Sequence, residues 1–279
     1  MLAVEVKSID RINEYNCDIL IFQTIFSSNF NNNCYKDLSN IKTNKKIALN
    51  VDKIITENEL PALKEFLKES LKYNIDYYIF SDLSVYNILN DLGVKNKFIY
   101  NAKTLLCSSY DIKSYNELGI ICLASTEITL DDVINISNLE NNAILVYGYS
   151  NIFYSKRKLI SLYSNYINKN IKLDDGYIIE ETRKEKYKIF ENNNGTFIYT
   201  PYIYYLFNEL NDINKNNIFM INSTFLNEED LIKVTNIYQD SFNYKFDETN
   251  LSRLKEINAN LGNGFLYLNP EILKVKNNE

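Results

Sequence analysis

The chain contains no histidine among its 279 residues. This absence excludes the Ser-His-Asp and Cys-His arrangements of hydrolases, histidine zinc sites and histidine general bases. Any acid–base or nucleophilic chemistry therefore has to use carboxylates, Lys, Tyr, Ser, Cys or an external cofactor. Tryptophan is also absent, so 23 Tyr and 15 Phe supply most of the bulky material for a core.

Cysteine is scarce, with Cys17, Cys34, Cys107 and Cys122 spread along the chain. No pair has the C-x-x-C spacing of a zinc or redox site. Cys17 and Cys122 lie in apolar runs, where a cysteine ordinarily serves as a small buried hydrophobe. No run approaches the roughly 18 apolar residues of a membrane span, and the N-terminus has no signal-peptide pattern. We expect a cytoplasmic protein with reduced thiols and no membrane association.

Eight short apolar segments, rich in Ile, Val, Phe and Tyr, recur along the chain. They are residues 2–6, 18–22, 46–51, 76–81, 97–101, 119–125, 143–149 and 217–222. Their nearly continuous apolar character is typical of strands covered on both faces, and helical patterns separate many of them. The alternation predicts a parallel sheet in a single domain over residues 1–279. Eight strands favour a (β/α)8 TIM-like barrel, with an open doubly wound sheet as the alternative.

The segment between the seventh and eighth predicted strands, about residues 174–200, has a different pattern. It alternates in places and contains the turn signal NNNG, which predicts an inserted β-hairpin. Charge is also uneven here. Residues 151–190 hold nine Lys and Arg against five Asp and Glu, in a chain with a net charge of −6. A basic face near RNA and a chance fluctuation of surface charge are both compatible with this count.

Polar side chains at the carboxyl ends of the predicted strands are candidate site residues, because active groups of parallel barrels lie there. These positions are Asp82, Asn101, Glu127 and, after the seventh strand, Tyr154, Ser155 and Arg157. Two of them have purely structural alternatives. Asp82 is placed to cap a helix, and Glu127 is placed in the first turn of the next helix, where an acid is favourable.

The seventh strand runs directly into the basic cluster Ser155-Lys156-Arg157-Lys158. We expect this cluster near the barrel mouth, on the side to which Glu127 points. Arg157 is predicted to have a specific partner, either Glu127 or an anion, because its guanidinium forms a bidentate fork. Lys156 and Lys158 are expected to lie along the surface with their charges in water.

Several stretches resemble peptidase family U32, the collagenase-like proteases. They are IDYYIFSDLSVYNIL (75–89), ASTEITLDDV (124–133), GYSNIFYSKRKLISLY (148–163), EETRKEKYKIFENNNGTFIYTPY (180–202) and NANLGNGFLYLNP (258–270). The chain looks like the short bacterial members that accompany a longer paralogue. The resemblance implies a barrel-like α/β fold and a divided function. Some members are labelled peptidases, and others take part in oxygen-independent hydroxylation of the tRNA wobble uridine (with prephenate implicated), ribosomal RNA or the ubiquinone ring.

Many members of the family carry an iron–sulfur cluster on four cysteines, in a segment resembling Tyr-Ser-Gly-Arg-Cys. Tyr154, Ser155 and Arg157 match this motif here, but Lys156 replaces the glycine and Lys158 replaces the cysteine. No cysteine occurs in the second half of the chain. Since such a cluster needs four converging sulfurs, we expect no cofactor on this chain and an iron–sulfur cluster only on a partner.

The resemblance therefore implies an accessory subunit in 5-hydroxyuridine formation at the tRNA wobble position. Its expected partner is a longer U32-family paralogue, with tRNA contacted through the complex. A U32 collagenase-like peptidase and a non-catalytic binding or scaffold protein are the alternatives. Proteolysis faces the difficulty that Ser155 and Lys156 are sequence neighbours, which rarely present both groups to one substrate atom.

Overall fold

The computed structural model describes residues 1–29, 39, 41–95, 97–103, 105–171, 176–182 and 184–268. Cys34 and residues 174, 175 and 183 of the predicted insertion lie outside these described residues. Within them, no helix combines the length and the apolar character that crossing a membrane requires.

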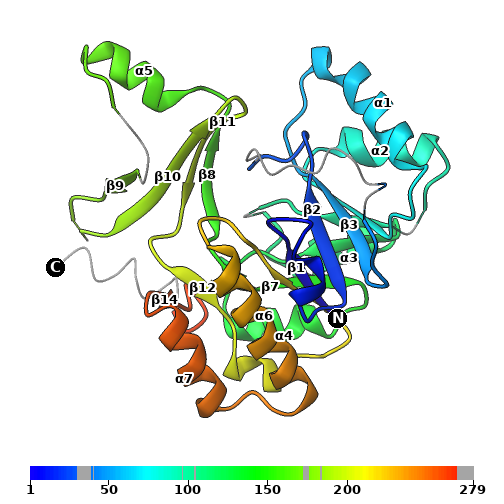
Figure 1. The fold of residues 1–279 in the computed structure, drawn as a ribbon, viewed down its shortest axis with the longest axis vertical. Coiled ribbons are helices and arrows are strands. Elements are labelled where there is room, and N and C mark those ends of the chain that lie inside the picture. Colours follow the sequence, from blue (N-terminus) through cyan, green and yellow to red (C-terminus); the bar gives the residue numbers. More distant parts are fainter. Residues whose placement is uncertain are drawn as a thin grey trace.

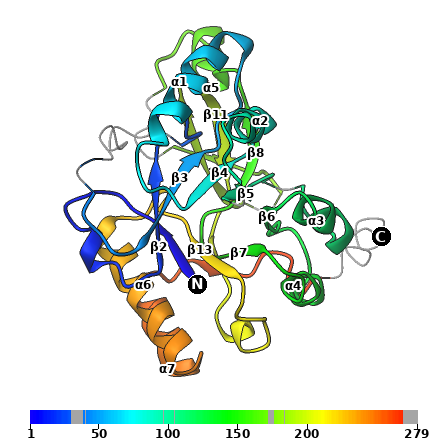
Figure 2. The same cartoon turned by 90° about the vertical axis from the view of Figure 1, so that its right-hand side faces the viewer.

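Eight parallel strands form a closed barrel (Figures 1 and 2). They are β1 (Leu2–Glu5), β2 (Ile19–Gln23), β3 (Lys46–Val51), β4 (Tyr77–Phe80), β5 (Phe98–Tyr100), β6 (Ile120–Leu123), β7 (Asn142–Gly148) and β13 (Ile218–Ile221). The barrel closes because β13 pairs in parallel with both β1 and β7. The predicted barrel and its eight strands are thus confirmed, and the closure excludes the open-sheet alternative.

Helices pack around the barrel and alternate with most of its strands. They are α1 (Leu60–Ser70), α2 (Leu83–Asp91), α3 (Ser109–Asn116), α4 (Leu130–Ser137), α6 (Glu228–Asn243) and α7 (Glu248–Ile257), with short 3-10 turns at Ile12–Glu14, Glu57–Glu59 and Asn208–Asn211. Leu63 and Leu67 of α1 are fully buried, one turn apart. Burial of each such side chain contributes about 1.5–3 kcal/mol, so the apolar stripe holds the helix on the sheet.

A second, antiparallel sheet of four strands follows β7. Its order is β8–β11–β10–β9, with β8 at Asn151–Ser155, β9 at Tyr177–Ile179, β10 at Lys186–Asn192 and β11 at Gly195–Tyr199. Strands β10 and β11 are the predicted hairpin, which is confirmed. Figure 1 shows this sheet rising from the barrel on the side away from α1, with α5 (Leu159–Tyr166) at its far end.

Two features anchor the second sheet. Gly195 has φ +134°, and a Cβ there would lie 2.1 Å from the Ser155 carbonyl oxygen, so only glycine fits this turn. After β11 the chain returns to the barrel as β12 (Ile203–Tyr205), which pairs antiparallel with β7 and parallel with β14 (Leu261–Gly262). The Tyr238 hydroxyl donates to the carbonyl oxygens of Val146 at 2.8 Å and Leu206 at 2.9 Å, tying α6 to this junction.

Candidate functional site

A polar cavity of about 110 Å³ opens at the carboxyl ends of the barrel strands. Its polar lining comes from the ends of β1, β3, β5, β6, β7 and β13, from the loop after β2 and from the four-stranded sheet. The polar residues are Glu5, Ser28, Asn29, Asn50, Asp52, Asn101, Lys103, Thr126, Tyr149, Ser150, Asn151, Tyr199, Asn222 and Thr224. This end of a parallel barrel is where ligand sites are built, so the cavity is the candidate site.

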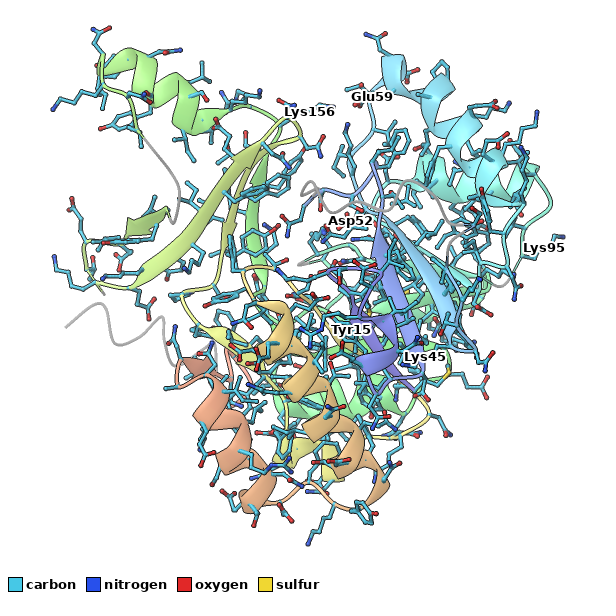
Figure 3. The ribbon with its side chains drawn as sticks, in the orientation of Figure 1. Tyr15, Lys45, Asp52, Glu59, Lys95 and Lys156 are labelled. Carbon is cyan, nitrogen blue, oxygen red and sulfur yellow. The ribbon has the colours of Figure 1, made fainter. Side chains whose placement is uncertain are left out.

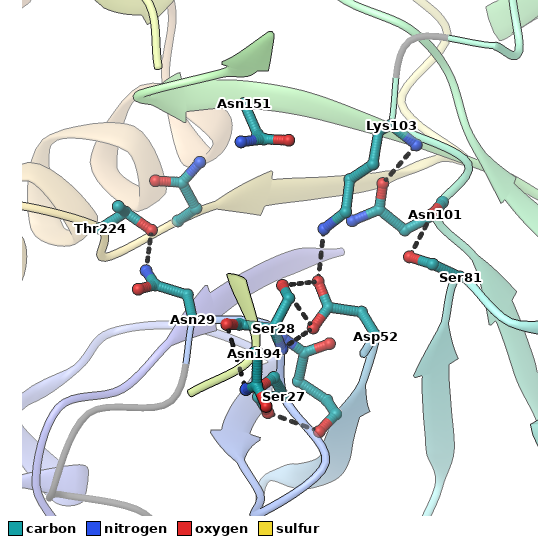
Figure 4. A network of polar contacts seen from close by, with 12 residues as sticks. Ser27, Ser28, Asn29, Asp52, Ser81, Asn101, Lys103, Asn151, Asn194 and Thr224 are labelled. Atoms are coloured by element: carbon teal, nitrogen blue, oxygen red, sulfur yellow. Dashed lines mark hydrogen bonds and ion pairs between the residues drawn. The ribbon is translucent and has the colours of Figure 1, made fainter. Parts of the chain in front are cut away.

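Asp52 is the most buried charged group of the cavity, with 4% of its surface exposed. Lys103 Nζ donates to its Oδ2, and Ser28 donates from its backbone nitrogen at 2.7 Å and its hydroxyl at 2.9 Å (Figure 4). Burial by itself raises the pKa of Asp52, but the ammonium and the Ser28 donors outweigh it and hold the pKa below its usual value. Asp52 is therefore a carboxylate at neutral pH, and Lys103 is its counter-ion.

Lys103 adopts a backbone conformation that side-chain-bearing residues rarely take, with φ +62°. Its backbone nitrogen donates to Asn101 Oδ1 at 3.1 Å, which holds this turn in place. Such a conformation costs about 1–3 kcal/mol and is concentrated at ligand sites and active sites. The loop after β5 is thus shaped to bring the lysine ammonium to Asp52.

On the opposite side of the barrel, Glu5 ends β1 and faces the end of β13. Its Oε2 accepts hydrogen bonds from the Ser223 backbone nitrogen and hydroxyl, both at 2.9 Å. Two amide oxygens in the lining, Asn50 Oδ1 and Asn222 Oδ1, are buried and have no hydrogen-bond partner among the described residues. Because an unsatisfied buried acceptor costs about 1–3 kcal/mol, these oxygens are suited to hydrogen-bond donors on water or a ligand.

Tyr199 lines the cavity from β11 of the four-stranded sheet and not from a barrel strand. Its side chain is 5% exposed, and its ring packs edge-on against Phe225 at 5.2 Å. Burial raises the pKa of Tyr199 strongly, and the charges of Asp52 and Glu5 raise it further. The hydroxyl is therefore a permanent hydrogen-bond donor in a region with two carboxylates.

A second, more apolar pocket of about 150 Å³ adjoins the first and shares Ser28, Asp52, Lys103 and Asn151 with it. We call it the aromatic slot. Its other lining residues come from barrel loops and the four-stranded sheet: Lys53, Ile54, Ser81, Tyr100, Ala102, Leu105, Tyr154, Asn194 and Phe197. The two pockets form one continuous site, polar inside the barrel and aromatic beneath the sheet.

Two of the six residues proposed from the sequence line this site: Asn101 in the polar cavity and Tyr154 in the aromatic slot. Asp82 caps α2, accepting from Ser84 nitrogen at 2.9 Å, and its other oxygen accepts from Ile55 nitrogen at 2.9 Å. Asp82 therefore has the helix-capping role that the sequence offered as the alternative to a role in the site. Glu127 lies on the surface, and partial burial raises the pKa of its carboxyl.

None of the basic-cluster residues Lys156, Arg157 and Lys158 lines either pocket, because β8 ends before them and places them beside the turn between β10 and β11. Arg157 is exposed, and among the described residues its guanidinium forms no ion pair, so the predicted brace to Glu127 is not formed. Lys156 instead lies 3.7 Å from Glu59, and Figure 3 shows these two side chains facing each other above Asp52. Lys158 donates to Asn193 Oδ1 at 2.9 Å.

Ser155 also lies outside both pockets, and its hydroxyl accepts from the Arg157 backbone nitrogen at 3.2 Å. Since the Lys156 ammonium is directed to Glu59, the two groups do not form a Ser-Lys pair.

Sequence reasoning missed the groups at the centre of the site. Glu5, Asp52 and Asn222 each end or follow a barrel strand, so the rule that found Asn101 would have found them if applied to every strand. Tyr199 had no such signal, because its position depends on how the second sheet folds over the barrel mouth.

The three cysteines that the structure describes lie in different parts of the barrel. Cys17 precedes β2 at the opposite end of the barrel, Cys122 lies within β6, and Cys107 is exposed in the loop before α3. Burial raises the pKa of both Cys17 and Cys122 to about 12. Among the described residues, no group of three or more Cys, Asp or Glu side chains is placed to hold a metal ion.

The chain is similar to known proteins in sequence and in fold. The family model described as Peptidase family U32 matches residues 23–274. A protein of Bacillus subtilis (strain 168) named tRNA hydroxylation protein P2 is 26% identical over 211 residues, which cover 72% of this chain and 68% of that protein. A solved structure of the U32 peptidase Mk0906 superposes with a TM-score of 0.47 at 10% identity, over 79% of this chain and 91% of that one. The chain, most of which the family model matches, belongs to peptidase family U32.

Proposed function

We propose that this chain is an accessory subunit in oxygen-independent hydroxylation of the tRNA wobble uridine. It works with a longer U32-family paralogue that carries the iron–sulfur cluster. The observation that carries the proposal is the similarity to a tRNA hydroxylation protein over 72% of the chain. That similarity concerns tRNA hydroxylation in general. The wobble position and the accessory role are the further steps of the proposal.

The chemistry of the barrel mouth supports a binding role. It offers a fixed carboxylate–ammonium pair, Asp52 and Lys103, together with amide groups and a neutral tyrosine. These groups are suited to hold and orient a polar ligand. They provide no thiolates for electron transfer, which agrees with a cluster on the partner.

The peptidase alternative has less support. Hydrolysis without histidine or a metal would need a Ser–Lys pair or a pair of carboxylates. The Ser28 hydroxyl and the Lys103 nitrogen are both directed to Asp52 and not to each other, so they do not form the nucleophile–base pair that serine activation requires. The two carboxylates of the cavity have separate partners, since Glu5 accepts from Ser223 and Asp52 accepts from Ser28 and Lys103.

The proposal is tested in the native host by deleting the gene and measuring 5-hydroxyuridine in bulk tRNA by mass spectrometry. We expect the modified nucleoside to fall when no redundant pathway exists, and to return when the gene is restored. The purified chain should be colourless under anaerobic conditions and lack stoichiometric iron and sulfide. An unchanged modification level in the deletion strain contradicts the function, and a cluster on the isolated chain contradicts the accessory role.

A further inference from the structure

The aromatic slot has the dimensions and walls of a site for one flat ring. Its volume of about 150 Å³ equals that of an engineered apolar cavity that binds benzene. The rings of Tyr154 and Phe197 form its sheet-side wall, with centroids 4.9 Å apart and planes tilted by 32°. Tyr100 and Ala102 line it from the barrel loops. Aromatic walls of this kind attract the faces of nucleobases.

The polar end of the slot presents one fixed acceptor and one fixed donor. Asn151 Nδ2 donates to the carbonyl oxygens of Phe153 at 3.0 Å and Ile198 at 3.1 Å, which sets the orientation of its amide. Its Oδ1 accepts no hydrogen bond from any described residue, and it lines both pockets. Lys103 also lines both pockets, and its ammonium retains donors beyond the one given to Asp52.

We infer that the aromatic slot binds a single pyrimidine base, with Asn151 Oδ1 and the Lys103 ammonium contacting its polar edge. This inference rests on the proposed function, which supplies uracil as the base. In uracil, the N3–H donates to Asn151 and a neighbouring carbonyl oxygen accepts from Lys103. A two-ring purine is larger than the single ring that this volume matches. The ribose and phosphates stay outside, so the slot takes a base that has left its stack, as enzymes acting on bases require.

The inference is tested by titrating the full-length purified chain with uridine and with adenosine, and following ligand saturation-transfer NMR signals. Both probes are neutral, so the net charge of the protein does not bias the comparison. We expect saturable uridine binding in the millimolar range and at least about tenfold weaker adenosine binding. Loss of one stacking ring in Tyr154→Leu should weaken uridine binding by about five- to a hundredfold, and Asn151→Ala should weaken it as well.

Tyr177→Leu is the matched control, because Tyr177 is an exposed aromatic of the same sheet outside the slot. Thermal unfolding of each variant shows whether it is folded. If Tyr154→Leu is misfolded, uridine binding by Asn151→Ala tests the inference in its place. Absence of uridine binding, equal binding of adenosine, or unchanged binding by both folded slot variants overturns the inference. These results are independent of the deletion experiment. If the purified chain binds uridine but the deletion strain keeps its normal level of 5-hydroxyuridine, the proposed function is wrong and the assignment of the slot is still supported.

Discussion

The ammonium of Lys103 donates a hydrogen bond to Oδ2 of Asp52, joining the loop after β5 to the end of β3 across 51 residues of sequence. Asp52 is almost fully buried, and Lys103 keeps only part of its side chain in water. The pair lies where the polar cavity and the aromatic slot meet. It therefore connects the stability of the barrel mouth with the electrostatics of the site.

Replacing Lys103 by Gln should destabilise the protein by about 3–5 kcal/mol at pH 7, because it leaves the Asp52 carboxylate buried without its counter-ion. In the wild type the pKa of Asp52 lies below its unfolded value of about 3.9. The contribution of the pair is thus present above about pH 4 and lost as the pH falls through the folded pKa. In the variant, burial raises that pKa, so stability should fall as the pH rises from about 4 to 7.

Urea unfolding at several pH values measures this difference in the free energy of unfolding. Lys72→Gln is the control, since Lys72 pairs with Glu69 on the exposed surface, where such pairs contribute little to stability. Equal pH profiles for wild type and Lys103→Gln would show that the pair does not hold Asp52 ionised.

Gly148→Ala should unfold at a markedly lower temperature than the wild type. Gly148 has φ +136°, and a Cβ there would lie 2.3 Å from Asn222 Oδ1. We expect a loss of at least about 1–3 kcal/mol from backbone strain, with a further loss from displacing Asn222. The double variant Gly148→Ala/Asn222→Ala removes the clash but keeps the strain. It should be less destabilised than the sum of the single changes, and strict additivity in this cycle would argue against the close contact.

Glu191→Ala should loosen the start of α5. Lys158, at the N-cap position, cannot cap the helix with its side chain, and Glu191 of β10 accepts from the backbone nitrogen of Ile160 at 2.8 Å and from Ser161 instead. Loss of such a cap costs about 1 kcal/mol. Amide hydrogen exchange in residues 160–166 should accelerate roughly fivefold, whereas Glu191→Gln, which keeps one acceptor oxygen, should change it less. Unaltered exchange in Glu191→Ala would mean that other contacts hold the helix.

Cysteine alkylation at pH 8 should be selective. Burial raises the pKa of Cys17 and Cys122 to about 12 and also blocks access, whereas Cys107 is exposed. The thiolate is the reactive form, so iodoacetamide should modify Cys107 before Cys17 and Cys122, as read by peptide mass spectrometry. Full modification of the two buried thiols in the folded protein would contradict their placement.

Arg157→Lys should leave the unfolding temperature nearly unchanged, because the exposed guanidinium forms no ion pair among the described residues. If the guanidinium contacts an anion on a partner or RNA, the same change should still lower 5-hydroxyuridine in a complemented deletion strain, since the bidentate fork is lost. Lys156→Gln is the companion variant, which breaks the 3.7 Å pair with Glu59 and should matter less. If Arg157→Lys restores 5-hydroxyuridine fully in the deletion strain, the Arg157 guanidinium does not have this anion-binding role.

The sequence by itself predicted the eight barrel strands and the hairpin, whereas the closure of the barrel was decided by the tertiary structure, in which β13 pairs with both β1 and β7. Strands such as β3 and β7 are continuous apolar segments, and helices such as α1 carry an apolar stripe, so their patterns are local and independent of partners. Asn101 could also be predicted as a site residue, because it directly follows a strand whose apolar pattern is local. The cap at Asp82 was visible as an alternative, because a cap depends only on neighbouring backbone nitrogens.

Only the tertiary structure decided which polar groups meet. Asp52 and Lys103 belong to different strand–loop units, and Tyr199 reaches the barrel mouth through the second sheet. Arg157 follows β7 and β8 in sequence, but it lines neither pocket, and Lys156 forms the ion pair with Glu59. Local patterns fix where strands and helices form, whereas the meeting of side chains distant in sequence depends on the closure of the barrel and the path of the insertion.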